Sequence, residues 1–414
     1  MLPNQIDKRQ FVPSRKYDIQ LHIKNTDYSN DLVDCQVIET INSIYTIVKM
    51  TIFVDARDII TNINGEDPIK LSIINVGEGE GMAGQRIDLE LMFLKSEYSI
   101  PISPQIYTDK QTERVSFPLT CVTRKPFKTM SSLVNKIFIG KTISNILQDL
   151  VKSTKTNSKL VLDSANLNNT VIDQVIIPPT TLTNAINSLD ETFGIFKGIT
   201  HSHCRYNNEV HVNNLTQKMN ETPKCTFYQL ASDSNNLEKI KKTSDGKTFY
   251  TYDAINIDNS DNTKFSIFSK NIKYISKPVD TLYYKIEEDL ENIATKYGLI
   301  DKNKQIKLDP NIDDRTRYYV QHTGYNKDNT FVISTMSKII ANMANINFRL
   351  ERDINFLTLI DSVGECVKFN TETSEYINLV GKYIMKSVLL NFHRTRDWNL
   401  VAVLYLIRSN RYTV

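Results

Sequence analysis

The side chains most able to bind a metal ion lie close together near the middle of the chain. The segment "HSHC" contains His201, His203 and Cys204, and His211 follows shortly after it. Histidine nitrogen and cysteine sulfur are the usual ligands of zinc. In a regular strand, however, His201 and His203 share one face while Cys204 lies on the other, and no Cys-x-x-Cys pair is present. We therefore predict ordinary strand residues here and no metal site.

Two further segments have the composition of binding loops. The run "GEGEGMAG", residues 77–84, lacks the Gly-Lys-Ser/Thr ending of a phosphate-binding loop, and its glutamates would repel phosphate. The run "DNSDNTK", residues 258–264, offers carboxylates but not the glycine and the more distant glutamate of a calcium loop. We expect a strand connection in the first, which leaves contact with a partner as its functional role, and Asx turns in the second.

The acidic run "EEDLE", residues 287–291, has the side chains that hydrolyse glycosidic bonds by acid–base catalysis. Apolar residues recur at helical spacing through residues 280–298, so we expect a charged helix whose solvated face contains this run. No pair of carboxylates is singled out by its neighbours. We therefore predict no catalytic residues and no cofactor, and an enzyme with carboxylates far apart in the chain remains the alternative.

Length and composition describe a folded protein of several domains. A chain of 414 residues with 40% hydrophobic and 23% charged residues is typical of globular proteins with more than one core. A net charge of +3 is too small for the basic field that holds nucleic acid, so we expect no specific nucleic-acid binding. Five scattered cysteines favour reduced thiols. We expect no signal peptide and no membrane span, because no apolar core follows the N-terminus and no run of about 18 apolar residues occurs.

Strand patterns dominate the first part of the chain. Six alternating, β-branched segments between residues 17 and 122 are separated by polar or glycine-containing breaks. Strands at this spacing favour a closed antiparallel barrel, which leaves no sheet edge exposed. We predict a first β-barrel domain over residues 1–122.

Helical spacing then takes over. In "GKTISNILQDLVKS", residues 140–153, Thr142 is a plausible N-cap, and "PPTTLTNAINSLDETFG", residues 178–194, has a second apolar stripe ended by glycine. We predict a helix-containing connector over residues 123–193 and a second β-barrel from residues 194–228 plus 346–414. An α/β insertion over residues 229–345 would contain the helix at 280–298 and another at 334–346. The predicted fold is thus mainly β (α+β), with two similar antiparallel barrels.

A weak internal repeat supports two similar barrels. Arg-Asp-Ile, a short apolar segment, Gly-Glu and a strand with one lysine follow one another in both halves of the chain. The spacing differs between the halves, and chance is the alternative explanation. The residues of this proposed repeat are Arg57, Asp58 and Gly65 in the first half and Arg352, Asp353 and Gly364 in the second.

The C-terminal segment predicts a hairpin that is covered on both faces. Its second strand, residues 398–407, is apolar on both sides, unlike a strand with one face in water. We expect one face to meet the barrel core and the other to pack against a neighbouring barrel, domain or subunit. Packing against the insertion of the same chain is the alternative. The residues expected to make this contact are Val401, Val403, Tyr405 and Ile407.

Four segments in this order resemble a known family. They begin "SIYTIVKMTIF", "GKTISNILQDL", "PPTTLTNAINS" and "GECVKFNTETS" and cover residues 43–75, 140–150, 178–199 and 364–407. Their pattern of strand, glycine and helix is similar to that of the central hub protein of contractile phage tail baseplates. That family is akin to the base of type VI secretion spikes. The resemblance extends over most of the chain, from about residue 17 to about residue 410.

The resemblance implies a homotrimer whose six barrels form a pseudo-hexameric ring. Its partners would be the hexameric tail tube protein at one end, the trimeric central spike protein at the other, and the wedge proteins of the baseplate. It further implies a virion component assembled in the host cytoplasm, with no enzymatic residues in the family core. The alternatives are a tail-associated peptidoglycan-degrading enzyme and a nucleic-acid-binding particle protein, which the small net charge disfavours.

Overall fold

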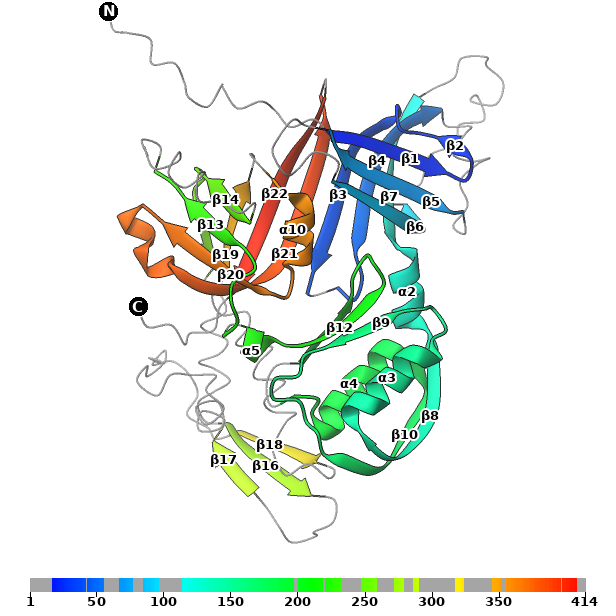
Figure 1. Cartoon of the computed structure of the whole chain (residues 1–414), viewed down its shortest axis with the longest axis vertical. Coiled ribbons are helices and arrows are strands. Elements are labelled where there is room, and N and C mark those ends of the chain that lie inside the picture. The colour runs from blue at the N-terminus through cyan, green and yellow to red at the C-terminus, as the bar shows by residue number, and fades with distance from the viewer. Residues whose placement is uncertain are drawn as a thin grey trace, which may run out of the picture.

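The computed structural model describes most of the chain. The described residues are 17–41, 43–55, 67–76, 85–96, 114–196, 200–218, 220–231, 247–258, 272–278, 286–289, 317–323, 345–350, 354–395 and 397–407. The fold is mainly β, as the sequence predicted, with a large sheet above a smaller helix-containing unit (Figure 1).

The N-terminal strands alternate between buried and exposed residues, because one face of each strand packs on a shared core. In β1 every second residue from Tyr17 to Ile23 is buried. All six strands predicted between residues 17 and 122 are present, together with the two-residue β2. The strands are β1 (Tyr17–Ile23), β2 (Thr26–Asp27), β3 (Leu32–Thr40), β4 (Ile47–Asp55), β5 (Ile69–Asn75), β6 (Arg86–Ser96) and β7 (Arg114–Thr123).

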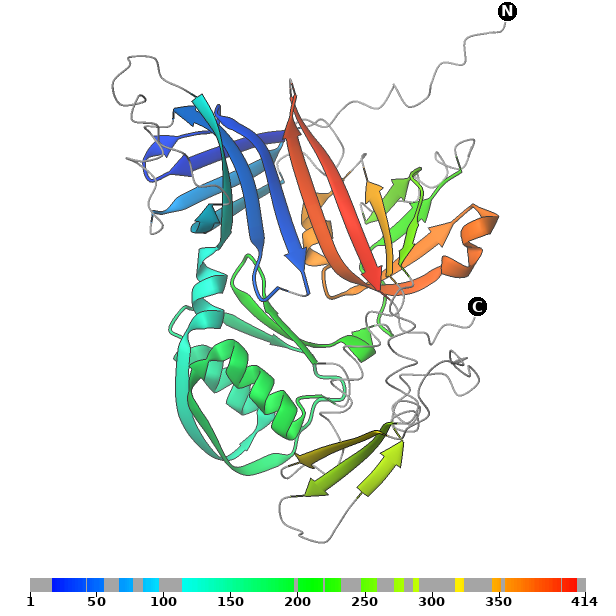
Figure 2. The ribbon, with the colours of Figure 1, turned by 180° about the vertical axis from the view of Figure 1, so that it is seen from behind.

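Two C-terminal strands close the N-terminal strands into a ring. The hairpin of β21 (Gly381–Arg394) and β22 (Trp398–Ile407) completes the path β21-β3-β4-β7-β6-β5-β1-β22, and β22 pairs with β21 again. Closure between β1 and β22 occurs at the pair Tyr17–Trp398. There the Tyr17 ring packs edge-on against Phe392, with 5.4 Å between centroids. Figure 2 shows β7, β4, β3, β21 and β22 side by side.

The same hairpin supports a second set of strands. From β21 the sheet continues through β20 (Cys366–Thr371) and β13 (Thr226–Gln229) to β14 (Thr248–Thr251). From β22 it continues through β19 (Asn345–Leu350) to β15 (Asn256–Asp258). Helix α10 (Phe356–Asp361) and the 3-10 helix η3 (Ser374–Leu379) flank this set.

The second set differs from the prediction in two ways. The sequence predicted purely antiparallel pairing, but β13 pairs parallel with both β14 and β20. The sequence also assigned residues 229–345 to an insertion, whereas β14 and β15 within that range belong to the large sheet. One continuous hydrophobic core lies under both sets and includes Leu71 on the N-terminal side and Phe227, Phe348 and Phe369 on the other.

The helix-containing unit follows β7 directly. Thr142 accepts a hydrogen bond from the amide of Asn145 and caps α3, as predicted, and Thr181 caps α4 in the same way through Asn184. Both helices turn an apolar stripe into a second core. The elements are α2 (Arg124–Ser131), β8 (Leu133–Thr142), α3 (Ile143–Ser153), β9 (Lys159–Leu162), β10 (Val171–Thr181), α4 (Leu182–Phe193), β11 (Thr200–Cys204), β12 (Glu209–Asn214) and α5 (Leu215–Lys218).

The hairpin of β11 and β12 belongs to this unit. The sequence placed residues 194–228 in the second barrel, but β12 pairs in parallel with β9. Cys204, Val210 and Val212 also share the core of α3 and α4. The change of core therefore falls after β12, because the apolar face of the hairpin is the one turned towards the helices.

A small separate sheet includes four residues of a predicted helix. Strand β16 (Ile272–Pro278) pairs antiparallel with β17 (Ile286–Asp289) and parallel with β18 (Arg317–Thr323). The helix predicted over residues 280–298 is therefore wrong at β17, because strand pairing overrides its helical spacing. The helix predicted over residues 334–346 lies outside the described residues, except at its end, where β19 begins. Within the described part of the chain, no helix combines the length and apolar character needed to cross a bilayer.

Candidate functional site

One of the six proposed repeat residues, Gly364, lies within the described residues. It stands between α10 and β20 with φ +79°, a left-handed conformation that favours glycine. A Cβ atom there would lie 3.6 Å from Nδ2 of Asn213 and 3.7 Å from Cε1 of His203, so the turn lies directly against the β11–β12 hairpin. The repeat itself stays a prediction. The residues outside the described part are Arg57, Asp58, Gly65, Arg352 and Asp353.

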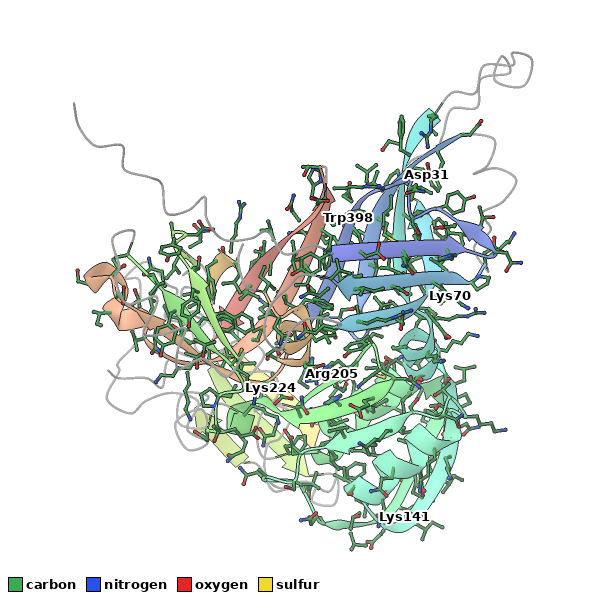
Figure 3. All side chains as sticks on the ribbon, turned by 45° about the horizontal axis from the view of Figure 1, so that its top comes forward. Asp31, Lys70, Lys141, Arg205, Lys224 and Trp398 are labelled. Carbon is green, nitrogen blue, oxygen red and sulfur yellow. The ribbon has the colours of Figure 1, made fainter. Side chains whose placement is uncertain are left out.

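Gly364 borders a buried polar cluster between the helix-containing unit and the large sheet. Figure 3 labels Arg205 where these two parts meet. The members come from the β11–β12 hairpin, from α5, from β3 and from the turn after α10. We call this set the junction cluster, and it consists of His201, His203, Arg205, His211, Lys218, Glu39, Asp361 and Glu365.

Arg205 is the centre of the charged part. The residue is 5% exposed, and its Nη2 donates to the carbonyl oxygen of Val363 at 3.2 Å and to Oε1 of Glu365 at 3.1 Å. Its Nη1 lies 4.0 Å from Oδ1 of Asp361. Arg205 belongs to the hairpin and its partners belong to the turn around Gly364, so these contacts join the two units.

Lys218 extends the network. Its Nζ lies 3.1 Å from the other oxygen of Glu365, 3.1 Å from Asp163 and 3.2 Å from Glu221. Burial lowers the pKa of Lys218, but the carboxylates, Glu365 first, outweigh burial and hold the pKa above its usual value. Glu365 therefore accepts from two cations, and the buried charges compensate one another.

Three imidazoles stack beside these charges. The ring centroids of His201 and His203 are 4.9 Å apart, and those of His203 and His211 are 5.2 Å apart. Burial, followed by the charge of His201, lowers the pKa of His203 well below its usual value. Burial and then Arg205 lower the pKa of His211 to about 4. Both rings are therefore neutral at pH 7.

The stack does not include Cys204, the fourth candidate ligand. As strand alternation predicted, Cys204 lies on the opposite face and packs in the helical core. In the described ranges, no three His, Cys, Asp or Glu side chains are grouped so that they could hold a metal ion. His201 instead shares a hydrogen bond of 2.6 Å with the carbonyl oxygen of Ile41, so it ties the hairpin to the end of β3.

Glu39 is the titratable group of the sheet that faces the junction. It is 2% exposed, and its Oε2 accepts from Oγ1 of Thr46 at 2.5 Å. Burial raises the pKa of Glu39 to about 7, although the hydrogen bond from Thr46 and the charge of Arg205 oppose the shift. The hydrogen-bonded partners across the junction are up to 160 residues apart in sequence. Sequence reasoning missed it because no local pattern marks such long-range pairs.

The cysteines lack the environment of a nucleophile. All five are buried free thiols. Burial raises the pKa of each, to about 12 for Cys121 and Cys225 and about 11 for Cys366. A thiol held protonated in this way is a poor nucleophile.

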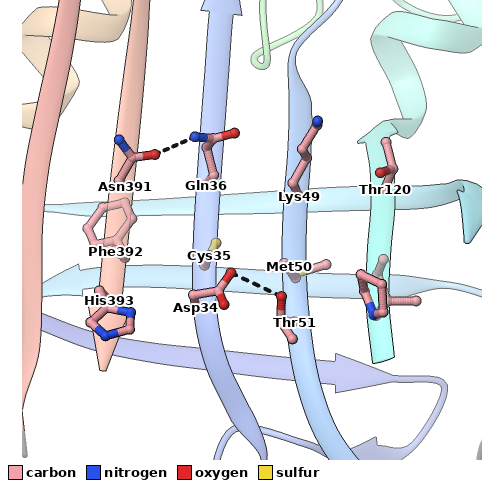
Figure 4. Close-up of a pocket in the computed structure, with 12 residues that line it drawn as sticks. Asp34, Cys35, Gln36, Lys49, Met50, Thr51, Thr120, Asn391, Phe392 and His393 are labelled. Atoms are coloured by element: carbon pink, nitrogen blue, oxygen red, sulfur yellow. Dashed lines mark hydrogen bonds between the residues drawn. The ribbon is translucent and has the colours of Figure 1, made fainter. Parts of the chain in front are cut away.

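A hollow lies on the outer face of the large sheet. It has a volume of about 290 Å³ and spans β21, β3, β4 and β7 (Figure 4). Asp34 accepts from Thr51 at 3.1 Å, and Gln36 donates to Asn391 across the strands. Exposed Lys49 stands beside these side chains. The hollow therefore presents hydrogen-bonding side chains at the surface of the sheet.

The predicted packing residues of β22 separate into two environments. Val401, Val403 and Tyr405 are half-buried and face outward from the sheet. Ile407 is buried and packs with Leu215 of α5 and Ile384 of β21. The contact with another barrel, domain or subunit stays a prediction for the three outward residues.

Comparisons with known proteins place this fold among tail proteins. The family described as Bacteriophage PBS1 gene 109 protein matches residues 97–230. The tail protein from Neisseria meningitidis MC58 aligns with a TM-score of 0.57 at 10% identity, over 96% of this chain and 98% of that one. The 43 kDa tail protein of prophage MuSo2 from Shewanella oneidensis aligns with a TM-score of 0.56 at 11% identity, over 95% and 99%.

A chain of the half-lidded Francisella PdpA–VgrG complex aligns with a TM-score of 0.51 at 14% identity, over 97% of this chain and 59% of that one. No curated protein matches. At these identities the likeness is one of fold. The resemblance to phage tail baseplate proteins and to type VI spike bases, which the sequence indicated, is confirmed at that level.

Proposed function

We propose that this chain is the structural hub of a contractile phage tail baseplate, located in the virion. It would form a homotrimer with pseudo-sixfold symmetry that joins the hexameric tail tube to the trimeric central spike. The main support is the shared β21–β22 hairpin, which closes the N-terminal ring of strands and also supports the second set. One chain thereby holds two β units side by side in a fixed relation.

The shared hairpin explains how three chains could match a partner with sixfold symmetry. A ring of three copies that each supply two β units presents six walls to a sixfold partner. Such matching needs the two units to keep their relative position under load. The continuous core under both strand sets supports that rigidity, because close-packed interiors resist deformation.

In this proposal the mechanism is geometric and uses no reactive side chain. The fold likeness over nearly the whole length of two tail proteins supports a structural role. The junction cluster would hold the helix-containing unit at a fixed angle to the sheet through Arg205 and Glu365. The tail tube protein, the central spike protein and the baseplate wedge proteins are the proposed partners, and assembly is proposed in the host cytoplasm.

The mass of the purified protein in solution tests the proposal. Light scattering coupled to size-exclusion chromatography should give three copies per particle over a wide range of concentration. A single copy at the highest concentration contradicts the trimer. Release of soluble fragments from purified cell walls by the same sample would instead favour the peptidoglycan-degrading enzyme.

A further inference from the structure

The β8–β10 ribbon has apolar side chains on both of its faces. Its inner face packs Val134, Phe138 and Ile177 onto the core of α3 and α4. Figures 1 and 2 both show this ribbon at the outer rim of the helix-containing unit, with the helices on its inner side. Strand alternation therefore turns the intervening residues away from the molecule.

Those outward residues form a large exposed apolar surface. Ile137 and Ile176 lie directly opposite each other in the register and are 58% and 59% exposed. Ile139 is 71% exposed and Leu133 is 76% exposed on the same side of β8. We call these four residues the open face. Val171, at the start of β10, is also exposed, whereas other large exposed hydrophobic residues of the described part, such as Phe53, Val76 and Ile377, lie outside the ribbon.

The size of the open face fits a protein partner. Four aliphatic side chains with such exposure offer on the order of 400 Å² of apolar surface. A standard protein interface buries about 800 Å² per partner, roughly 60% of it apolar. The open face thus supplies most of the apolar area of one complete interface.

The surroundings of the open face also fit a protein partner. Charges of both signs flank the ribbon, since Lys141 pairs with Asp149 at 2.5 Å and lies opposite Ile172, the neighbour of Asp173. A rim of mixed charge is typical of a protein interface, whereas a membrane surface or a nucleic acid would favour one sign. In the described part of the chain, β8 and β10 pair only with each other, so the outer edges of the ribbon are open too.

We propose that the open face is covered by a neighbouring copy of this chain. The inference rests on the proposed trimer. In a closed ring of three, each copy gives one surface to the neighbour on one side and a different surface to the other neighbour. The open face has the area needed for one of these two surfaces. An identical copy is also present from synthesis onward, before any other partner can shield so much apolar surface.

The test replaces the opposed pair Ile137 and Ile176. The double variant Ile137→Glu/Ile176→Lys removes the apolar contact but allows a cross-strand ion pair, which preserves the ribbon. Val76→Glu is the matched control, because Val76 is 52% exposed and lies outside the ribbon. Light scattering across a dilution series gives the concentration at which the particles dissociate, and circular dichroism checks the fold.

The proposal expects the double variant to dissociate at a concentration at least about 100-fold higher than the wild type, a loss of about 2.7 kcal/mol. The control should leave dissociation unchanged. A milder variant, Ile139→Thr, keeps a strand-forming residue and should shift dissociation about 10-fold if the double variant is unfolded.

The outcomes separate this inference from the proposed function. If the wild type is a trimer and both ribbon variants dissociate at the same concentration as the wild type, the inference is overturned and the hub proposal stands. A different protein would then cover the open face. A wild type that contains one copy contradicts the trimer, and the inference fails with it.

Discussion

Replacing Arg205 should destabilise the protein far more than replacing an exposed arginine. The Arg205→Met variant keeps the aliphatic stem but removes the cation that contacts Glu365, Val363 and Asp361. Breaking a buried ion pair by removing one partner costs about 3–5 kcal/mol. Because Glu365 keeps Lys218 at 3.1 Å, we expect the lower end of this range, about 3 kcal/mol.

Thermal unfolding followed by calorimetry measures the effect. A loss of about 3 kcal/mol corresponds to a melting temperature lower by roughly 6–12 °C in a cooperative unit of 150–250 residues. The control is Arg86→Met, because the side chains of Arg86 and Asp88 are 53% and 58% exposed although they lie 2.8 Å apart. An exposed pair contributes about 0–1 kcal/mol, so the control should melt close to the wild type.

Salt separates the buried contact from a surface effect. In about 1 M NaCl the Debye length is about 3 Å, so exposed pairs are screened while buried pairs are not. The difference between Arg205→Met and the wild type should therefore persist at high salt. Equal melting temperatures for Arg205→Met and Arg86→Met at both salt concentrations would refute the role given to the junction cluster.

Three further predictions concern the same region. Glu39 has a pKa of about 7 in the folded protein against an ordinary value of 4.5. The stabilisation from its protonated form is therefore complete below pH 4.5 and is lost as the pH rises through 7, which lowers the free energy of unfolding by about 3 kcal/mol. Glu39→Gln should therefore lose less stability than the wild type between pH 5 and pH 8 in thermal melts, and an unchanged pH slope contradicts the burial of this carboxyl. His211 has its pKa lowered from 6.5 to about 4, so its contribution is complete above pH 6.5 and is lost as the pH falls towards 4. His211→Asn should flatten the decline between pH 7 and pH 5, measured in the same melts, whereas a decline as steep as that of the wild type counts against a buried neutral ring. Gly364→Ala places a Cβ atom in a backbone conformation with φ +79° and should lower the free energy of unfolding, measured by chemical denaturation, by about 1–2 kcal/mol. A denaturation curve like that of the wild type would mean that the turn adopts another conformation.

Local patterns were sufficient for the elements whose burial follows from alternation or helical spacing. The buried residues of β1 are every second residue, and Thr142 caps α3 where the apolar stripe begins. The opposed faces of His203 and Cys204 followed from the same alternation. These features depend on neighbours a few residues away, so the sequence contains them directly.

Pairing between distant segments could not be predicted in this way. The β21–β22 hairpin joins the N-terminal ring through β3 and β1, which lie more than 300 residues earlier in the chain, as the pair Tyr17–Trp398 shows. Alternation specifies which face of a strand is buried but not which strand lies beside it. The parallel pairing of β13 and the contact of Arg205 with Glu365 escaped prediction for the same reason.

Images of single particles test the central claim most directly. Class averages of the full chain, viewed along the symmetry axis, should show a threefold ring with six similar lobes around an opening. Each pair of lobes would be the two β units that share the β21–β22 hairpin of one chain. A ring with three lobes, or particles of one copy at every concentration, would contradict the account.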